Sequence, residues 1–267
     1  MINVAIDAVC LDAYPLLSES FENYSFFVFD SLNNVDRENY PVVMLFYEGK
    51  LSLSMMDGKR PIYVDVDFSA GQSVYRNENK SVKNELLAKA VGIKSNEASG
   101  LKILDATAGF GRDSLLLASF GCQVVMLERS PLMAALLLDG LQRAKNERTL
   151  RDTVKRMSLL HTDALGILQV ASFPSVMKEG FVFSPDVIYL DPMFPGTNKS
   201  AQVKKDMRIL RCALGEEMDG EELICRAMAS GVKRVVVKRP RKGAVLGGGK
   251  PSFQVIGKSA RFDVYFP

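Results

Sequence analysis

The sequence has few of the residues that metal and disulfide sites need. It contains one histidine, His161, which excludes a site built from several histidine ligands. Its four cysteines lie far apart and form no C-x-x-C pair: Cys10, Cys122, Cys212 and Cys225. This spacing indicates neither a zinc site nor a disulfide framework. We therefore expect a protein that works without a metal.

Long apolar runs are also missing. No stretch approaches the roughly 20 consecutive apolar residues that cross a bilayer. The first residues, MINVAIDAVCLDAYPLL, have no basic region and include Asp7 and Asp12, so they make a poor signal peptide. We expect a soluble, cytoplasmic protein without membrane contact. Its 267 residues, 47% of them apolar, suffice for a main domain and a smaller partner.

Acidic residues are absent from the last part of the chain. Between Leu223 and Phe262 there is no Asp or Glu, while ten residues are basic: Arg226, Lys233, Arg234, Lys238, Arg239, Arg241, Lys242, Lys250, Lys258 and Arg261. A second basic group, interrupted only by Asp206, consists of Lys199, Lys204, Lys205, Arg208 and Arg211. Ordinary solvated faces would explain either group. The one-sided charge nevertheless favours a polyanion partner, because phosphate backbones attract such surfaces through counterion release.

The first 75 residues are typical of short β-strands. The stretch PVVMLFYEGKLSLSMM predicts a hairpin that turns at 48–50, and Leu51, Leu53 and Met55 alternate with serines after the turn. The stretch PIYVDVDF alternates likewise. Polar residues follow at 71–81, GQSVYRNENKS, where we place a boundary. We predict a small β-rich N-terminal domain at 1–75 and a main domain at 76–267.

The main domain begins with SVKNELLAKAVGI, whose apolar residues have helical spacing, and from Leu101 onward strands alternate with helices. We predict strands at 101–106, 122–128, 156–161, 186–191 and 233–239. We predict helices at 111–121, 130–146, 200–213 and 220–229, and a closing hairpin at 253–266. Ser130 suits the N-cap of the second of these helices, and Pro131 its first position. The alternation predicts an α/β fold with a doubly wound, mainly parallel sheet and helices on both faces.

Ligands of such sheets bind outside the carboxyl ends of the strands. The first strand is followed by the loop DATAGFGRD, and three later strands end in polar residues. The residues that collect at this edge are Asp105, Gly109, Gly111, Arg112, Asp113, Glu128, Arg129, Asp163 and Asp191. The glycines allow the backbone to approach a ligand closely, and a carboxylate such as Glu128 can bridge two ribose hydroxyls.

The loop favours S-adenosylmethionine over a nicotinamide cofactor. The dinucleotide motif G-x-G-x-x-G would need a third glycine where Ser114 stands. Asp105 and Asp113 place negative charge at both ends of the loop, which suits a cationic ligand better than a pyrophosphate. S-adenosylmethionine has a ribose and a positive sulfonium but no phosphate.

Each of these residues also has a structural explanation. Asp105 could cap the turn that follows it. Gly109 and Gly111 could serve tight turns only, and Glu128 could be a solvated strand end. His161 follows an apolar strand, so we expect a packed, hydrogen-bonded side chain rather than a general base. The pattern as a whole is more specific than any one member.

The stretch DVIYLDPMFPG places an acid and a rigid turn where an apolar strand ends. The exocyclic amine of a base is a poor nucleophile because its lone pair is delocalised into the ring. Acceptors around its N–H groups favour a pyramidal nitrogen, and Asp191 and the carbonyl of Pro192 can supply them. Phe194 offers a face for stacking a planar base. Alignment of the amine with the methyl group then supplies most of the catalysis.

Five motifs together resemble one family. LDATAGFGRD, MLERSP, YLDPMFP, VKRP and RFDVY are similar to motifs of the bacterial ribosomal RNA small subunit methyltransferase J family. The resemblance covers about residues 75–267. The DPMF stretch is also similar to the D/N-P-P-aromatic motif of amino methyltransferases, with Met193 in place of the second proline.

The resemblance implies a fold, an activity and a set of site residues. It implies a seven-stranded class I methyltransferase (Rossmann-like) sheet and the S-adenosylmethionine-dependent methylation of a guanine N2 in 16S ribosomal RNA. It implies cofactor contacts at Arg112, Asp113, Glu128, Arg129, Asp163, Ala164 and Asp191. Asp191, Pro192 and Phe194 are then the catalytic residues.

We expect the basic residues to contact this RNA or the small ribosomal subunit. The hypothesis places Lys199, Lys204, Lys205 and Arg208 on one side of a cleft, and Lys238, Arg239 and Arg241 on the other. Two alternatives stay open at this point. One is methylation of another amine, in DNA adenine or a protein glutamine, and the other is a non-catalytic RNA-binding factor in ribosome assembly.

Overall fold

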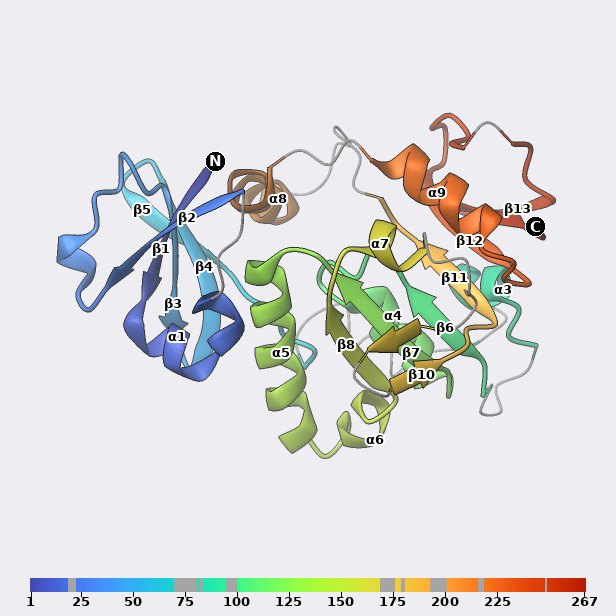
Figure 1. Cartoon of the computed structure of the whole chain (residues 1–267), viewed down its shortest axis with the longest axis horizontal. Helices are drawn as coiled ribbons and strands as arrows, with labels where there is room; N and C mark the ends of the chain where they lie inside the picture. Colours follow the sequence, from blue (N-terminus) through green and yellow to red (C-terminus); the bar gives the residue numbers. More distant parts are fainter. Residues whose placement is uncertain are drawn as a thin grey trace. The chain divides into compact units, whose positions relative to one another are not determined.

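Figure 1 shows the order of the elements in a computed structural model. The structure describes residues 1–18, 23–69, 81, 84–94, 100–168, 176–178, 181–192, 201–215, 219–247 and 249–267. For 176–178, 181 and 201–206 it describes the backbone alone. No helix within these ranges is long and apolar enough to span a membrane.

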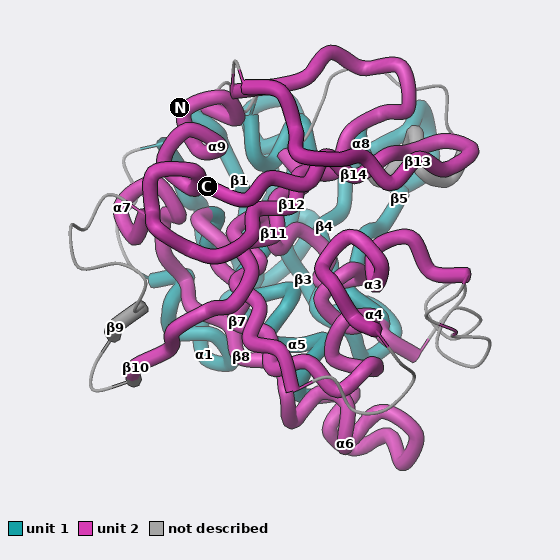
Figure 2. Tube along the Cα trace, turned by 90° about the vertical axis from the view of Figure 1, so that its right-hand side faces the viewer, with its two compact units in different colours: residues 1–67, 130–142, 196–216 teal, residues 68–129, 143–195, 217–267 magenta. Residues whose placement is uncertain are grey.

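The chain forms two compact units (Figure 2). Unit 1 consists of Met1–Asp67, Ser130–Gln142 and Gly196–Glu216, and unit 2 of Phe68–Arg129, Arg143–Pro195 and Glu217–Pro267. The boundary that we predicted near residue 75 lies outside the described residues and stays a prediction.

Unit 2 contains a seven-stranded sheet in the order β13-β14-β12-β11-β6-β7-β8. Its strands are β6 (Lys102–Asp105), β7 (Gln123–Glu128), β8 (Met157–His161), β11 (Val187–Leu190), β12 (Val235–Pro240), β13 (Phe253–Ile256) and β14 (Ala260–Tyr265). The five strands from β12 to β8 are parallel, and β14 and β13 are antiparallel to their neighbours. The predicted fold class and closing hairpin are confirmed.

Four helices before and between these strands also lie close to their predicted positions. They are α3 (Leu86–Val91), α4 (Arg112–Ser119), α5 (Pro131–Asn146) and α9 (Gly220–Ala229). Ser130 Oγ accepts a hydrogen bond from the backbone N–H of Met133 at 3.4 Å, which confirms the predicted N-cap. The sequence did not predict α6 (Arg151–Val154), α7 (Ala164–Leu168) or the small hairpin of β9 (Val176–Lys178) and β10 (Phe181–Phe183).

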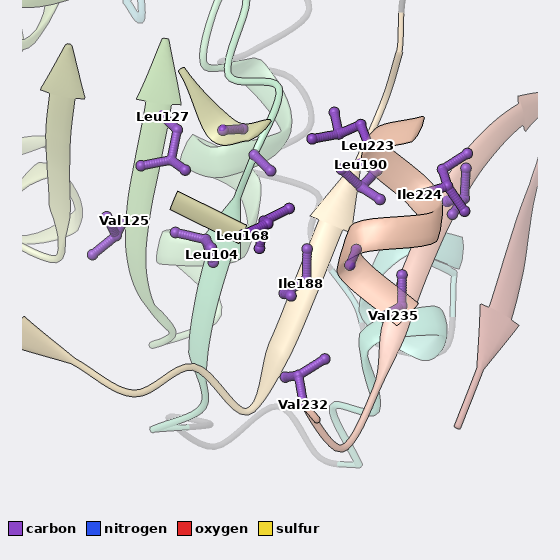
Figure 3. Close-up of a cluster of buried hydrophobic side chains, with 14 of the residues drawn as sticks. Leu104, Val125, Leu127, Leu168, Ile188, Leu190, Leu223, Ile224, Val232 and Val235 are labelled. Carbon is purple, nitrogen blue, oxygen red and sulfur yellow. The ribbon is translucent and has the colours of Figure 1, made fainter. Parts of the chain in front are cut away.

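One face of the large sheet is covered by α7 and α9. Figure 3 shows their side chains packed on alternate residues of four parallel strands. Leu104, Leu127, Ile188 and Val235 come from the strands, and Leu223 comes from α9. Burial of such residues contributes about 1.5–3 kcal/mol each. Packing of this apolar face on α7 and α9 fixes the strands in place. Because the strands are parallel, the polar residues at their carboxyl ends lie along one edge of the sheet.

Unit 1 contains a five-stranded sheet in the order β2-β1-β3-β4-β5. The strands are β1 (Ile2–Asp7), β2 (Tyr24–Phe29), β3 (Val42–Tyr47), β4 (Lys50–Asp57) and β5 (Arg60–Val64), and α1 (Ala8–Ala13) contacts β1 and β3. Tyr47 pairs with Lys50, and Glu48 and Gly49 between them have φ of 49° and 74°. Two left-handed residues suit a tight hairpin turn, so the predicted hairpin is confirmed. The parallel pair β1–β2 was not predicted.

Helix α8 (Ala201–Leu214) belongs to unit 1 and contacts β1, β3, β4 and β5. Ile209, Leu210 and Ala213 are buried, whereas Arg211 and Cys212 between them are exposed. This amphipathic pattern explains why the helix packs on a sheet. A role of this segment in covering the N-terminal sheet was not predicted.

Candidate active site

The order of the sheet in unit 2 reverses between β6 and β11. From β6 the chain continues outward through β7 and β8, and from β11 it continues in the other direction to β12. Ligands of open α/β sheets bind at such a switch point. The two loops are joined there, because the backbone N–H of Asp191 donates a hydrogen bond to Thr107 Oγ1 at 2.6 Å. The structure thus brings the predicted glycine-rich loop and the predicted catalytic acid together.

The glycine-rich loop needs its glycines. Gly109 and Gly111 have φ of 50° and 67°, a region that other residues rarely adopt, and Gly111 is the N-cap of α4. A Cβ at Gly109 would meet no atom closer than Thr107 O at 4.0 Å, so the space beside the loop is open. Gly109 N donates to Glu128 Oε2 at 3.2 Å, which places this carboxylate beside the loop.

Asp105 lies beneath the loop and is 1% exposed. One carboxyl oxygen accepts from Thr107 N at 3.1 Å, and the other accepts from Ser114 Oγ at 2.5 Å. Burial raises its pKa to about 7, although these two hydrogen bonds act in the opposite direction. These contacts suit the turn-capping role that the sequence left open, and a direct cofactor contact is not supported by its burial.

Lys238, at the carboxyl end of β12, contacts two acids of the site. Its Nζ lies 2.6 Å from Asp113 Oδ2 and 2.7 Å from Asp191 Oδ2. Tyr189 OH donates to Asp113 Oδ2 at 2.7 Å. Burial alone would lower the pKa of Lys238, but the two carboxylates outweigh it and raise that pKa above its ordinary value. Burial, followed by the nearby acids, also raises the pKa of Tyr189, so its hydroxyl remains a donor.

The other predicted cofactor residues lie around this centre. Arg112 is exposed, with its guanidinium 4.8 Å from the ring centroid of Phe110. Arg129 is paired with Asp219, the residue that precedes α9. Its backbone oxygen lies 3.2 Å from His161 Nε2, so His161 is hydrogen-bonded as expected.

Two neighbouring predicted residues lie at the start of α7. Asp163 is exposed, and its carboxylate accepts from Leu165 N at 2.9 Å, as a helix cap does. Ala164 is buried. Their predicted contact with the cofactor stays a prediction.

Several predicted substrate residues cannot be placed. Phe194 and Lys199 lie outside the described residues, as do the side chains of Lys204 and Lys205. Arg208 is described, and its Nη1 forms an ion pair with Asp57 in unit 1 at 2.9 Å.

The C-terminal basic residues differ sharply in exposure. Arg239 is 5% exposed and donates from Nε to Ala244 O at 3.0 Å. Lys238 is engaged by two carboxylates, as described above. Lys238 and Arg239 thus have partners within unit 2, whereas Arg241 is exposed, and the RNA contacts of all three stay predictions. Of the three residues predicted for this side of the cleft, Arg239 is buried, Lys238 is partly exposed and paired with two carboxylates, and Arg241 is exposed.

Sequence reasoning missed three contributions to the site. Thr107 was read only as a small loop residue, Tyr189 as part of a buried strand, and Lys238 as a contact for phosphate. A polar tyrosine inside the apolar run VIYL is one signal that could have been used, because a buried hydroxyl usually has a partner. The pairing of Lys238 with Asp113 depends on strand order and has no local signal.

Comparison with known proteins decides the family. A family model described as "Putative SAM-dependent methyltransferase" matches residues 29–267. The protein named "Ribosomal RNA small subunit methyltransferase J" of Thioalkalivibrio sulfidiphilus is 45% identical, over 84% of this chain and 84% of its own. The protein of the same name from Pseudoalteromonas atlantica is 42% identical over 88% of each chain. This chain belongs to the ribosomal RNA small subunit methyltransferase J family.

A solved structure agrees in fold with this assignment to the methyltransferase J family. The crystal structure of a SAM-dependent methyltransferase from Neisseria gonorrhoeae is similar to the chain with a TM-score of 0.68 and 33% identity. The match covers 99% of this chain and 96% of that chain. The predicted resemblance and the class I methyltransferase fold are therefore confirmed. The chain is an enzyme, a methyltransferase whose methyl donor is S-adenosylmethionine.

The residues present fit this donor. Glu128 can bind ribose hydroxyls beside the open glycine-rich loop, and Asp113 and Asp191 are carboxylates that suit a cationic ligand. Among the residues that the structure describes, no group of three or more His, Cys, Asp or Glu side chains is arranged so that it could hold a metal ion.

Proposed function

We propose that this enzyme methylates the exocyclic N2 amine of a guanine in 16S ribosomal RNA of the small ribosomal subunit. Two kinds of support point the same way. The relatives reported above are named for methylation of small-subunit ribosomal RNA. The acid Asp191 stands at the switch point, bonded through its own N–H to the loop that would bind the donor. The position of Asp191 is the single observation that carries the chemical part of the proposal.

Asp191 acts as an acceptor for the amine. Its carboxylate takes a hydrogen bond from an N–H of the target nitrogen, so that the nitrogen lone pair points toward the methyl group. Bound S-adenosylmethionine supplies an electrophilic methyl group on its sulfonium. On transfer of that methyl group to the nitrogen, with the sulfur as leaving group, Asp191 would take up the proton that the amine loses and pass it to solvent.

Pro192 holds the turn that presents this acceptor. Its side chain is buried, and a Cβ built at Gly220, the first residue of α9, would lie 3.2 Å from Pro192 Cβ. The start of α9 thus packs closely against the proline ring. The carbonyl of Pro192 is proposed as a second acceptor for the amine, and Phe194 as the surface on which the base stacks.

Other residues hold the donor and the RNA. We propose that the loop ending at Asp113, together with Glu128, Arg129, Asp163 and Ala164, binds S-adenosylmethionine. Lys199, Lys204, Lys205, Arg208 and Arg241 are the proposed phosphate contacts. A guanine paired in a helix hides its N2 edge, so the base is extruded before it reacts.

The location and domain division follow from this proposal. The proposed substrate is 16S ribosomal RNA, free or within the small subunit, so we place the enzyme in the cytoplasm. Every proposed cofactor contact comes from unit 2, which supports a catalytic domain at 76–267 and a small N-terminal domain at 1–75. Segments 130–142 and 196–216 of the catalytic domain then pack within unit 1.

The test uses labelled S-adenosylmethionine and small subunits from a strain that lacks the gene. We expect label on the N2 of one guanine in 16S RNA. Asp191→Ala should lower the rate at least about a hundredfold while the protein stays folded. Asp152→Ala, which removes an exposed acid from α6, should retain full activity.

Two outcomes would contradict the proposal. Undiminished labelling by Asp191→Ala would remove the acceptor role of this acid. Label in DNA adenine or in a protein, with none in ribosomal RNA, would favour one of the alternative substrates.

A further inference from the structure

We propose that Lys238 is a positioning residue for methyl transfer, whose ammonium group fixes the carboxylate of Asp191 and links it to Asp113 at the start of α4. The inference rests on the proposed role of Asp191 and extends it to a residue that makes no contact with the substrate. It also replaces our expectation that Lys238 contacts RNA phosphates.

The first support is geometric. Lys238 Nζ lies within hydrogen-bond distance of one oxygen of each carboxylate, at 2.6 Å and 2.7 Å. Asp191 comes directly after β11, Asp113 lies in the first turn of α4, and Lys238 lies on β12. One ammonium group therefore joins three elements of the sheet edge. The side chain of Asp191 is 37% exposed, so it needs such a contact to keep one orientation.

The second support is the charge around this group. Asp105 from β6, Asp113 from α4 and Asp191 after β11 bring three carboxyl groups together, and Tyr189 adds a hydroxyl that remains protonated. Arg239, the next residue on β12, directs its Nε toward Ala244 O. Lys238 is a cation in direct contact with both Asp113 and Asp191. Without it, the neighbouring acids would favour protonation of one of them.

The protonation state of Asp191 matters for the reaction. A carboxylate accepts hydrogen bonds through both oxygens, whereas a protonated carboxyl group uses one of them as a donor. An aspartic acid in the neutral form would orient the amine poorly. Lys238 thus has two effects through Asp191, one on its orientation and one on its ionisation.

The test removes the charge and follows the rate against pH. Lys238→Met should lower kcat about ten- to hundredfold, because a small misplacement of a reacting group has effects of this size. The acid limb of the pH profile of kcat should move to higher pH by about one pH unit or more. Lys238→Arg should restore the position of the acid limb. Lys155→Met, which breaks an exposed ion pair with Asp152, should change neither quantity.

Chemical rescue separates positioning from a structural role. In Lys238→Ala, added methylammonium can occupy the place of the lost ammonium group, and kcat should rise with its concentration. Tetramethylammonium, which has no N–H donor, should give no rescue. A variant that had lost only stability would respond to neither cation. Should Lys238→Met fail to fold, Lys238→Gln takes its place in the pH profile.

The controls distinguish two kinds of failure. If Asp191→Ala retains activity, the proposed role of Asp191 is wrong and the inference falls with it. If Asp191→Ala is inactive but folded Lys238→Met has the kcat and the pH profile of the natural protein, then only the inference is overturned. A slower Lys238→Ala without rescue by methylammonium would also overturn it.

Discussion

Asp105 has its carboxyl group inside unit 2, next to the site but turned away from solvent. Its partners are Thr107 N and Ser114 Oγ, and burial raises its pKa to about 7. In the unfolded chain the pKa of an aspartate is close to its ordinary value of about 3.9. Between these two values the folded state binds a proton that the unfolded state has lost. The stabilisation from this group is therefore full below about pH 4 and is lost as the pH rises through about 7.

Because the stabilisation from Asp105 falls as the pH rises, the effect of Asp105→Asn on stability should depend on pH. The free energy of unfolding of the natural protein, taken relative to this variant, should fall by a few kcal/mol between pH 4.5 and pH 8, since a tenfold change in a protonation equilibrium corresponds to about 1.4 kcal/mol. Urea unfolding at the two pH values measures it. Asp163→Asn, which alters an exposed carboxylate, is the matched control and should give the same difference at both. A difference for Asp105→Asn that did not change with pH would contradict the ionisation of this buried group.

Thr107 shows how a single hydroxyl can connect two loops. Its Oγ1 accepts from Asp191 N, while its own N–H donates to Asp105 Oδ1. The acid beneath the loop and the acid at the switch point are thereby held through one residue. Threonine is common in loops for many reasons, so the sequence alone did not mark this position.

Helix α8 has a structural role besides the one that its charge suggests. The run of lysines and arginines predicted a surface that contacts RNA, yet the buried side of the helix packs on the sheet of unit 1. The two roles are compatible, because buried Ile209 and Leu210 lie beside exposed Arg208 and Arg211 in the sequence.

Substitutions in α8 should separate these two sides. Leu210→Ala removes a side chain that is 2% exposed, and we expect a loss of about 2–5 kcal/mol in the free energy of unfolding. Arg211→Ala changes the exposed neighbour and should cost less than about 0.5 kcal/mol. Urea unfolding of both variants measures the contrast. Equal losses would mean that packing of this helix does not stabilise the unit.

At the scale of the elements, the sequence predicted features that depend on neighbouring residues and missed those that depend on residues far apart in the chain. The strands of unit 2 are short apolar runs bounded by turn residues, so their positions along the chain and the end that carries polar groups could be predicted. The pair β1–β2 was missed because parallel pairing joins residues far apart in the sequence, such as Val4 and Phe26. The ion pairs of Lys238 were missed for the same reason, since α4, β11 and β12 meet only after folding.

At the scale of the whole molecule, the basic C-terminal run divides into residues with partners inside unit 2 and exposed residues. Several of its members stabilise unit 2 through contacts inside that unit. Arg261 pairs with buried Asp263 and donates from Nη1 to three backbone carbonyls, of Pro240, Arg241 and Gly243. Arg234 lies over the ring of Phe266 at 5.1 Å. Charge counted along the sequence therefore overstates the charge presented to a partner.

Five of the ten members are exposed: Lys233, Arg241, Lys242, Lys250 and Lys258. Arg241 and Lys242 follow directly after β12, the strand that carries Lys238 to the active site. Arg261 fixes the backbone of this segment through its contacts with the carbonyls of Pro240 and Arg241. A segment held in place, exposed and basic beside the site is well suited to contact RNA phosphates.

The double variant Arg241→Ala/Lys242→Ala tests whether these two residues contact RNA phosphates. Each phosphate contact contributes about 0.7 to 0.9 to the slope of log affinity against log salt concentration. We therefore expect weaker binding of 16S RNA, with a slope less steep by about 1.5. The matched control is Lys145→Ala/Arg148→Ala, which removes the same charge from exposed residues at the end of α5 and just after it. If both variants changed the slope equally, binding would depend on net charge alone. The proposal that Arg241 and Lys242 contact RNA phosphates would then be wrong.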